Sequence, residues 1–139
     1  MTLIHIQAGP YQFKGKLEEE KAPNTCAVFK TMLPYRQKVI HSRWSGEAVW
    51  IPLGDLDLGI EFENHTSFGS RGDLLVYPGG LSETEFLFVY GSSCFAAKVG
   101  QLAGNHIMSL VEGHENLEAF GKLVLWEGAQ DIEFSLAEE

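Results

Sequence analysis

Residues 40–51 read IHSRWSGEAVWI and predict a β-hairpin. The serine-glycine pair in the middle supplies a two-residue turn, because glycine readily adopts the positive φ that such turns need. Counting outward from that turn places His41 directly across from Trp50. Side chains alternate between the two faces of a strand, so His41, Arg43 and Trp50 are predicted to share one face.

The two faces of this hairpin differ in polarity. One face carries Trp44, Val49 and Ile51, and we expect it to pack in the protein core. The other face looks outward and sets Arg43 beside Trp50. An arginine in that position can stack on the indole ring or hold a carboxylate or carbonyl oxygen in a fixed fork. The alternative is an ordinary solvated face, which antiparallel sheets commonly have.

Composition indicates one mostly β domain. The 139 residues fit a single domain over residues 1–139, and 45% are hydrophobic, enough for a core without crosslinks. Fifteen glycines and five prolines indicate many turns and therefore mostly strands. Cys26 and Cys94 match neither a metal-binding spacing nor a disulfide framework. We expect both to be buried thiols in a reducing compartment.

The charge balance narrows the range of partners. The formal net charge is −9, which disfavours binding to nucleic acids and to anionic membranes. No stretch has the length of a transmembrane helix, and the first residues lack the pattern of a secretion signal. The sequence therefore predicts a soluble, cytoplasmic protein, and it assigns no cofactor and no metal.

The rest of the chain alternates in the manner of strands, with two helical segments. A stripe formed by Cys26, Phe29 and Leu33 predicts a helix that begins near residue 22 and ends before Pro34. Asn24 or Thr25 is expected to cap its start. A second, short helix is predicted over residues 116–123. Strands are predicted over residues 2–7, 11–16, 72–77, 84–90, 94–99, 105–111 and 131–136. This order predicts a closed β-barrel or curled sheet with one or two short helices.

Two further segments offer polar side chains to a ligand. His65 lies in a long polar connection over residues 54–72, and long loops in compact domains are often binding loops. Glu61 and Glu63, together with His65 and His41, could form a metal site of mixed oxygen and nitrogen ligands, but their spacing matches no known metal motif. Gln101 opens a glycine-bounded segment that suits either a pocket rim or a simple turn.

Several motifs together resemble a known family. Residues 21–29, KAPNTCAVF, are similar to the start of a helix in cyclophilins. The segment 33–47 and the strand GDLLVYP over residues 72–78 resemble bacterial cyclophilin-like proteins of unassigned function. The resemblance spans most of residues 2–136. It implies a closed β-barrel with a helix covering one end.

Cyclophilins are prolyl isomerases that carry an arginine at the end of a Phe-His-Arg segment on the outer barrel face. The resemblance implies that Arg43, which follows His41 and Ser42, occupies a similar place. The Phe-x-x-Gln-Gly-Asp segment that follows in cyclophilins is missing from this chain. Prolyl isomerisation is therefore an alternative and not the leading hypothesis.

The leading hypothesis is a protein that binds a small carboxylate- or amide-containing molecule on the outer barrel face. The candidate ligand-binding residues are His41, Arg43, Trp50, His65 and Gln101. In this hypothesis Arg43 holds the carboxylate or carbonyl, Trp50 forms an apolar wall and the two histidines donate hydrogen bonds or move protons. A third hypothesis is a non-catalytic module that buries exposed Trp50, Tyr77 and Phe68 in a homo-oligomer interface.

Overall fold

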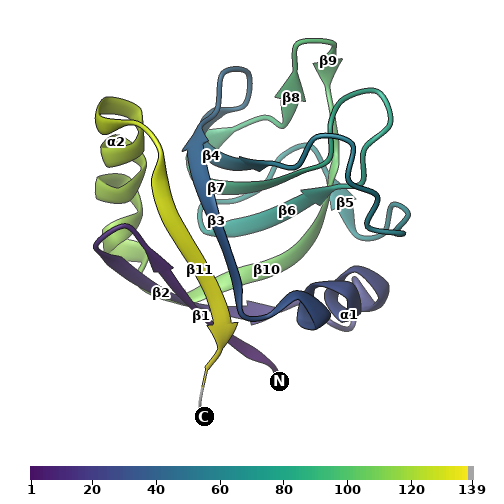
Figure 1. The fold of residues 1–139 in the computed structure, drawn as a ribbon, viewed down its shortest axis with the longest axis horizontal. Helices are drawn as coiled ribbons and strands as arrows, with labels where there is room; N and C mark the ends of the chain where they lie inside the picture. Colours follow the sequence, from purple (N-terminus) through teal and green to yellow (C-terminus); the bar gives the residue numbers. More distant parts are fainter. Residues whose placement is uncertain (138–139) are drawn as a thin grey trace.

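The computed structural model describes residues 1–137 as a β-barrel with two α-helices (Figure 1). The helices are α1 (Pro23–Met32) and α2 (Leu117–Glu127), the latter preceded by the 3₁₀ turn η1 (His114–Asn116). The strands are β1 (Leu3–Ala8), β2 (Tyr11–Leu17), β3 (Tyr35–His41), β4 (Gly46–Pro52), β5 (His65–Thr66), β6 (Asp73–Tyr77), β7 (Glu85–Ser93), β8 (Ala96–Ala97), β9 (Gly100–Gln101), β10 (Gly104–Glu112) and β11 (Gln130–Leu136).

Eight antiparallel strands close on themselves to form the barrel. Their order is β2-β1-β11-β3-β4-β7-β6-β10, and β10 pairs with β2 to complete the ring. The short β5 adds to the edge of β10, and β8 pairs with β9 in a separate small hairpin. This architecture confirms the predicted mostly β fold with a closed barrel and two helices.

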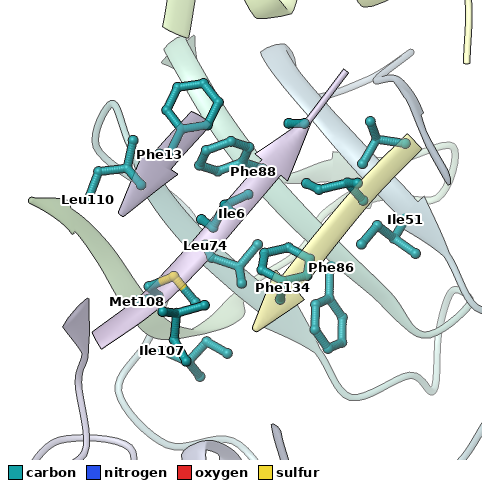
Figure 2. Close-up of a cluster of buried hydrophobic side chains, with 14 of the residues drawn as sticks. Ile6, Phe13, Ile51, Leu74, Phe86, Phe88, Ile107, Met108, Leu110 and Phe134 are labelled. Carbon is teal, nitrogen blue, oxygen red and sulfur yellow. The ribbon is translucent and has the colours of Figure 1, made fainter. Parts of the chain in front are cut away.

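Alternate side chains of the barrel strands point inward and form the main core. Figure 2 shows these inner side chains, from strands far apart in the sequence, meeting in one cluster. The helices pack against different parts of it. Phe29 of α1 lies 5.8 Å from Phe86 and 5.5 Å from Phe134, measured between ring centroids. Phe120 of α2 instead packs on Phe13, at 6.0 Å, and on Phe88.

A second apolar cluster covers part of the outer face of the barrel. It contains Ala48, Leu75, Tyr77, Leu87, Val89, Phe95 and Leu102, and we call it the outer cluster. Most of its members are the outward-pointing residues of β4, β6 and β7, whose other faces line the main core. The segment around β8 and β9 covers them. Strands buried on both faces read as continuous apolar runs, which explains the composition of residues 84–90.

α1 begins and ends where the sequence predicted, but its N-terminal cap differs from the predicted one. Pro23 stands in the first turn, and the helix ends at Met32, before Pro34. Neither Asn24 nor Thr25 caps the helix through its own side chain. The Glu63 carboxylate instead accepts hydrogen bonds from the backbone N–H of Thr25, at 2.5 Å, and of Asn24, at 3.4 Å. The predicted local cap is therefore wrong, and a distant loop provides one.

Both cysteines are free thiols. Cys26 is fully buried, and that burial raises its pKa to about 12, so it is an unreactive core residue. Cys94 is half-buried, so its predicted burial is only partly confirmed. Among residues 1–137, none of the helices has the length and apolar character needed to cross a bilayer.

Candidate functional site

The hairpin at residues 40–51 pairs in a different register from the predicted one. Ile40 lies across from Trp50, and His41 lies across from Val49. The reason is the connection, in which residues 42–45 join β3 to β4 where a two-residue turn was expected. A one-residue shift moves every side chain of a strand to the opposite face. The predicted pairing of His41 with Trp50 is therefore wrong.

His41 consequently lies away from the outer face that carries Trp50. Its Nε2 atom is 2.9 Å from the hydroxyl of Tyr90, a member of the main core, and its Nδ1 atom is 2.9 Å from the carbonyl oxygen of Ser42. Trp44 was expected in the core, but it belongs to the connection and is 56% exposed. Val49 and Ile51 do face the main core, as predicted.

Arg43 and Trp50 nevertheless line the same cavity, which has a volume of about 210 Å³. The outer cluster forms part of its wall through Leu87. Three other segments complete the lining: the connection at residues 42–45, the trio Ser82, Glu83 and Glu85, and residues 96–98. We call this cavity the outer-face pocket. Of the five predicted ligand-binding residues, it brings together two.

The carboxyl group of Glu85 is the most unusual feature of the outer-face pocket. Glu85 begins β7 and alternates with Phe86, whose ring faces the main core, so its own side chain lies on the outer side. The residue is only 6% exposed, and among residues 1–137 its carboxyl group makes no hydrogen bond or ion pair. The carboxyl oxygens are not completely enclosed, and they open onto the pocket. Burial, with a smaller contribution from the charge of Glu83, raises its pKa to about 8. Partial burial without a protein partner disfavours the charged form of a carboxyl, and groups with such shifted pKa values gather at functional sites.

Trp50 contributes a second polar group without a partner. Its indole Nε1 is buried, and no acceptor for it exists among the described residues. Three charged side chains complete the polar lining, namely Arg43, Glu83 and Lys98. All three are exposed, and none takes part in an ion pair within residues 1–137. The outer-face pocket thus combines an aromatic wall with both acidic and basic groups.

The remaining predicted site residues lie elsewhere. His65 is exposed on β5, with its ring 4.8 Å from that of Phe62. Gln101 is exposed on β9, on the far side of the turn from Lys98. Neither residue lines the outer-face pocket. Glu63 is engaged at α1, and no group of three potential metal ligands is assembled anywhere in the described part of the chain.

Glu85 and Lys98 were not among the predicted site residues. Glu85 did carry a signal, because a lone acidic residue in the otherwise apolar strand 84–90 is rarely buried without a reason. Lys98 carried none, since an exposed lysine in a turn is ordinary. Tyr77, expected to be exposed, is buried in the outer cluster, and its hydroxyl accepts hydrogen bonds from the backbone N–H of Leu81 and Ser82.

A second polar cluster lies on the barrel wall between β10 and β6. His106 Nε2 is 3.1 Å from Asp73 Oδ1 and 2.9 Å from Ser109 Oγ. Burial lowers the pKa of His106, but the hydrogen bond and charge of Asp73 outweigh it and raise the pKa overall. A serine-histidine-aspartate relay needs the two partners on different ring nitrogens, so this cluster does not form one.

Comparison with solved structures supports the fold. The structure of McbB in complex with tryptophan matches with a TM-score of 0.70 and 17% sequence identity, over 98% of this chain and 45% of that one. The chain thus spans about half the length of McbB. The solution structure of the hypothetical protein AF2241 from Archaeoglobus fulgidus matches with a TM-score of 0.61 and 16% identity, over 98% and 95% of the two chains. Neither is described as a cyclophilin, so that resemblance remains a prediction.

No curated protein matches the chain. One protein family does, and its description reads "Protein of unknown function (DUF3830)". The match covers residues 4–136, from β1 to the last residue of β11. Because this is nearly the whole chain, the protein belongs to the DUF3830 family.

Proposed function

We propose that the outer-face pocket binds a small molecule that carries a carboxylate or amide group. The observation that carries this proposal is the carboxyl group of the largely buried Glu85, which opens onto the pocket and has no hydrogen-bond partner among residues 1–137. Such a group lowers the stability of the fold, so its presence in a cavity favours a role toward a ligand. The unpartnered Nε1 of Trp50 in the same lining adds a second group of this kind.

The basic side chains indicate which ligand group is bound. Arg43 presents a planar fork of donors that matches a carboxylate, and Lys98 adds a second positive charge on another segment. The rings of Trp44 and Trp50 offer apolar surface to the rest of the ligand. The volume of about 210 Å³ lies below the roughly 300–1,000 Å³ of pockets for drug-sized molecules, so the ligand is a small metabolite.

The structural neighbour McbB supports small-ligand binding in this chain, because McbB was solved in complex with tryptophan. That likeness is one of fold, at 17% identity. The assignment of a pocket and of ligand-contacting residues in this chain therefore rests on its own side chains.

The test is a thermal-shift and calorimetric screen with small aliphatic and aromatic carboxylates and their primary amides. A ligand at about a hundred times its dissociation constant should add about 2.7 kcal/mol of stability. We expect Arg43→Ala to remove the response. Arg36→Ala is the matched control, because Arg36 is an exposed arginine on β3 that pairs with Glu133 outside the pocket. The proposal fails if no compound binds, or if binding survives Arg43→Ala unchanged.

A further inference from the structure

The outer-face pocket carries both acidic and basic side chains, and these do not pair with each other. From this we infer that its ligand is a zwitterion, a free amino acid with an apolar side chain. The inference rests on the proposed function and narrows it, since a carboxylate alone satisfies only half of the polar lining. Its carboxylate would lie at Arg43 and Lys98, and its ammonium group at Glu83 and Glu85.

The charged side chains of the pocket do not pair with one another. Arg43, Lys98, Glu83 and Glu85 all line one cavity, yet among residues 1–137 no ion pair or side-chain hydrogen bond includes any of them. Elsewhere on this protein, neighbouring opposite charges do pair, as at Lys38 and Asp131, 2.7 Å apart. The pocket therefore holds its acids and bases apart, with space between them for a molecule.

The second step is the arrangement of these charges on different elements. The bases come from the connection after β3 and from the turn between β8 and β9. Of the acids, Glu83 precedes β7 and Glu85 is its first residue. A molecule with only a carboxylate would leave the Glu85 carboxyl without a partner of opposite charge. A molecule with only an amine would leave Arg43 and Lys98 unused. Only a ligand with both groups satisfies the lining, and this is how a site rejects close analogues.

The third step concerns size and the apolar wall. The apolar part of the lining consists of Trp44, Trp50, Leu87 and the two alanines of β8, and three serines complete the uncharged lining. A cavity of about 210 Å³ suits one amino acid better than a peptide. The apolar wall favours a side chain that gains from leaving water, such as that of phenylalanine, tryptophan or leucine.

The state of the Glu85 proton follows from the same geometry. Glu83, Arg43 and Lys98 share the pocket with it, and Tyr77 faces it from β6, while its β4 partner Pro52 is not titratable. Without a ligand, burial keeps Glu85 mostly protonated at neutral pH. An ammonium group beside a carboxyl favours the ionised form of that carboxyl. Binding of a zwitterion should therefore release close to one proton from Glu85 at pH about 7.

The experiment is isothermal titration calorimetry with matched compounds. Phenylalanine, tryptophan and leucine are each compared with the acid that lacks the amino group and the amine that lacks the carboxylate, such as 3-phenylpropionate and phenethylamine. We expect at least one amino acid to bind about tenfold or more tightly than both of its counterparts. Repeating the titration in buffers of different ionisation enthalpy measures the released proton.

Two variants separate the group that binds the ammonium of the ligand from the group that binds its carboxylate. Glu85→Gln should weaken amino-acid binding about tenfold and abolish proton release, while leaving 3-phenylpropionate within about twofold. Glu20→Gln, at an exposed position outside the pocket, is the control and should change neither quantity. Lys98→Met, at an exposed position that should not disturb folding, should weaken the amino acid and the acid alike.

The outcomes distinguish the inference from the proposed function. If 3-phenylpropionate and its analogues bind as tightly as the amino acids, the zwitterion inference is overturned and carboxylate binding stands. Binding of the amino acids with no proton release, or with no loss in Glu85→Gln, also overturns it. If neither amino acids nor acids bind, both the inference and the proposed function fail.

Discussion

The imidazole Nε2 of His41 lies 2.9 Å from the hydroxyl oxygen of Tyr90, and the two rings meet edge to face with centroids 5.6 Å apart. This contact joins the end of β3 to the middle of β7. Tyr90 also packs directly on α2, where a Cβ atom added to Gly121 would come within 2.1 Å of its ring. His41 therefore belongs to the junction between the barrel and α2, and not to the outer-face pocket.

We expect His41→Ala to affect stability and not ligand binding. Losing the hydrogen bond to Tyr90 should lower the free energy of unfolding by about 1 kcal/mol, measured by urea denaturation. Ligand affinity, measured by calorimetry, should stay within about twofold of wild type, in contrast to Arg43→Ala. An affinity loss in His41→Ala as large as that in Arg43→Ala would place His41 at the ligand after all.

Glu63 should stabilise α1 from outside the helix. Its carboxylate accepts hydrogen bonds from the backbone N–H of Thr25, at 2.5 Å, and from the Thr25 hydroxyl, at 2.6 Å. A negative charge at a helix N-terminus also interacts favourably with the helix dipole. Glu63→Ala should therefore lower the free energy of unfolding by about 1–2 kcal/mol. Glu61→Ala is the matched control, because the Glu61 side chain is exposed and makes no hydrogen bond among residues 1–137. Equal effects of the two substitutions would contradict this role.

The pKa of His106 should depend on Asp73. Although burial opposes the charged ring, Asp73 at 3.1 Å raises the pKa of His106 above its usual 6.5. The contribution of protonated His106 to the free energy of unfolding is thus present below pH 6.5 and is lost as the pH rises through its raised pKa. An NMR titration should show a pKa above 6.5 in wild type and a lower one in Asp73→Asn. Asp55→Asn, on an exposed loop, should leave the titration of His106 unchanged. If Asp73→Asn also leaves the titration of His106 unchanged, Asp73 is not the cause of the raised pKa.

Local patterns predicted most elements of this fold because the forces that form them are local, but the strand predicted over residues 94–99 is only the two-residue β8. Alternating side chains predicted the strands, and Pro23 and Pro34 marked the two ends of α1. The closed barrel followed from strand number and from the cyclophilin-like motifs. Residues that depend on distant contacts were mispredicted. Tyr77 looked exposed in its strand, but the segment around Phe95 covers it.

The register of the hairpin in the candidate site was also mispredicted because it depends on distant contacts. Ser45 was assigned to a tight turn, but its hydroxyl donates to the carbonyl oxygen of Ala96 and accepts from the Ala96 N–H, both at 3.0 Å. The hydroxyl of Ser93 in turn donates to the carbonyl oxygen of Ser45 at 2.6 Å. These bonds, which join residues about fifty positions apart, hold the longer connection in place. Rules for local turns do not include them, so the sequence placed His41 on the wrong face.

The raised pKa of Glu85 predicts how stability should change with pH. An unfolded chain releases this proton near pH 4.5, whereas the folded protein keeps it until about pH 8. In that interval the folded state binds more protons, so the contribution of Glu85 to the free energy of unfolding falls as the pH rises, by at most about 1.4 kcal/mol per pH unit. The contribution is complete below pH 4.5 and is lost through pH 8.

Glu85→Gln tests this dependence, because an amide does not titrate and keeps the shape of the neutral carboxyl. We expect the variant to gain stability relative to wild type as the pH rises from about 5 to about 8, measured by urea denaturation in the absence of ligand. Glu20→Gln should follow the wild-type profile, since Glu20 is exposed. Parallel profiles for wild type and Glu85→Gln would mean that Glu85 ionises normally in the folded protein. The burial of an unpaired carboxyl, on which the proposed pocket depends, would then lose its support.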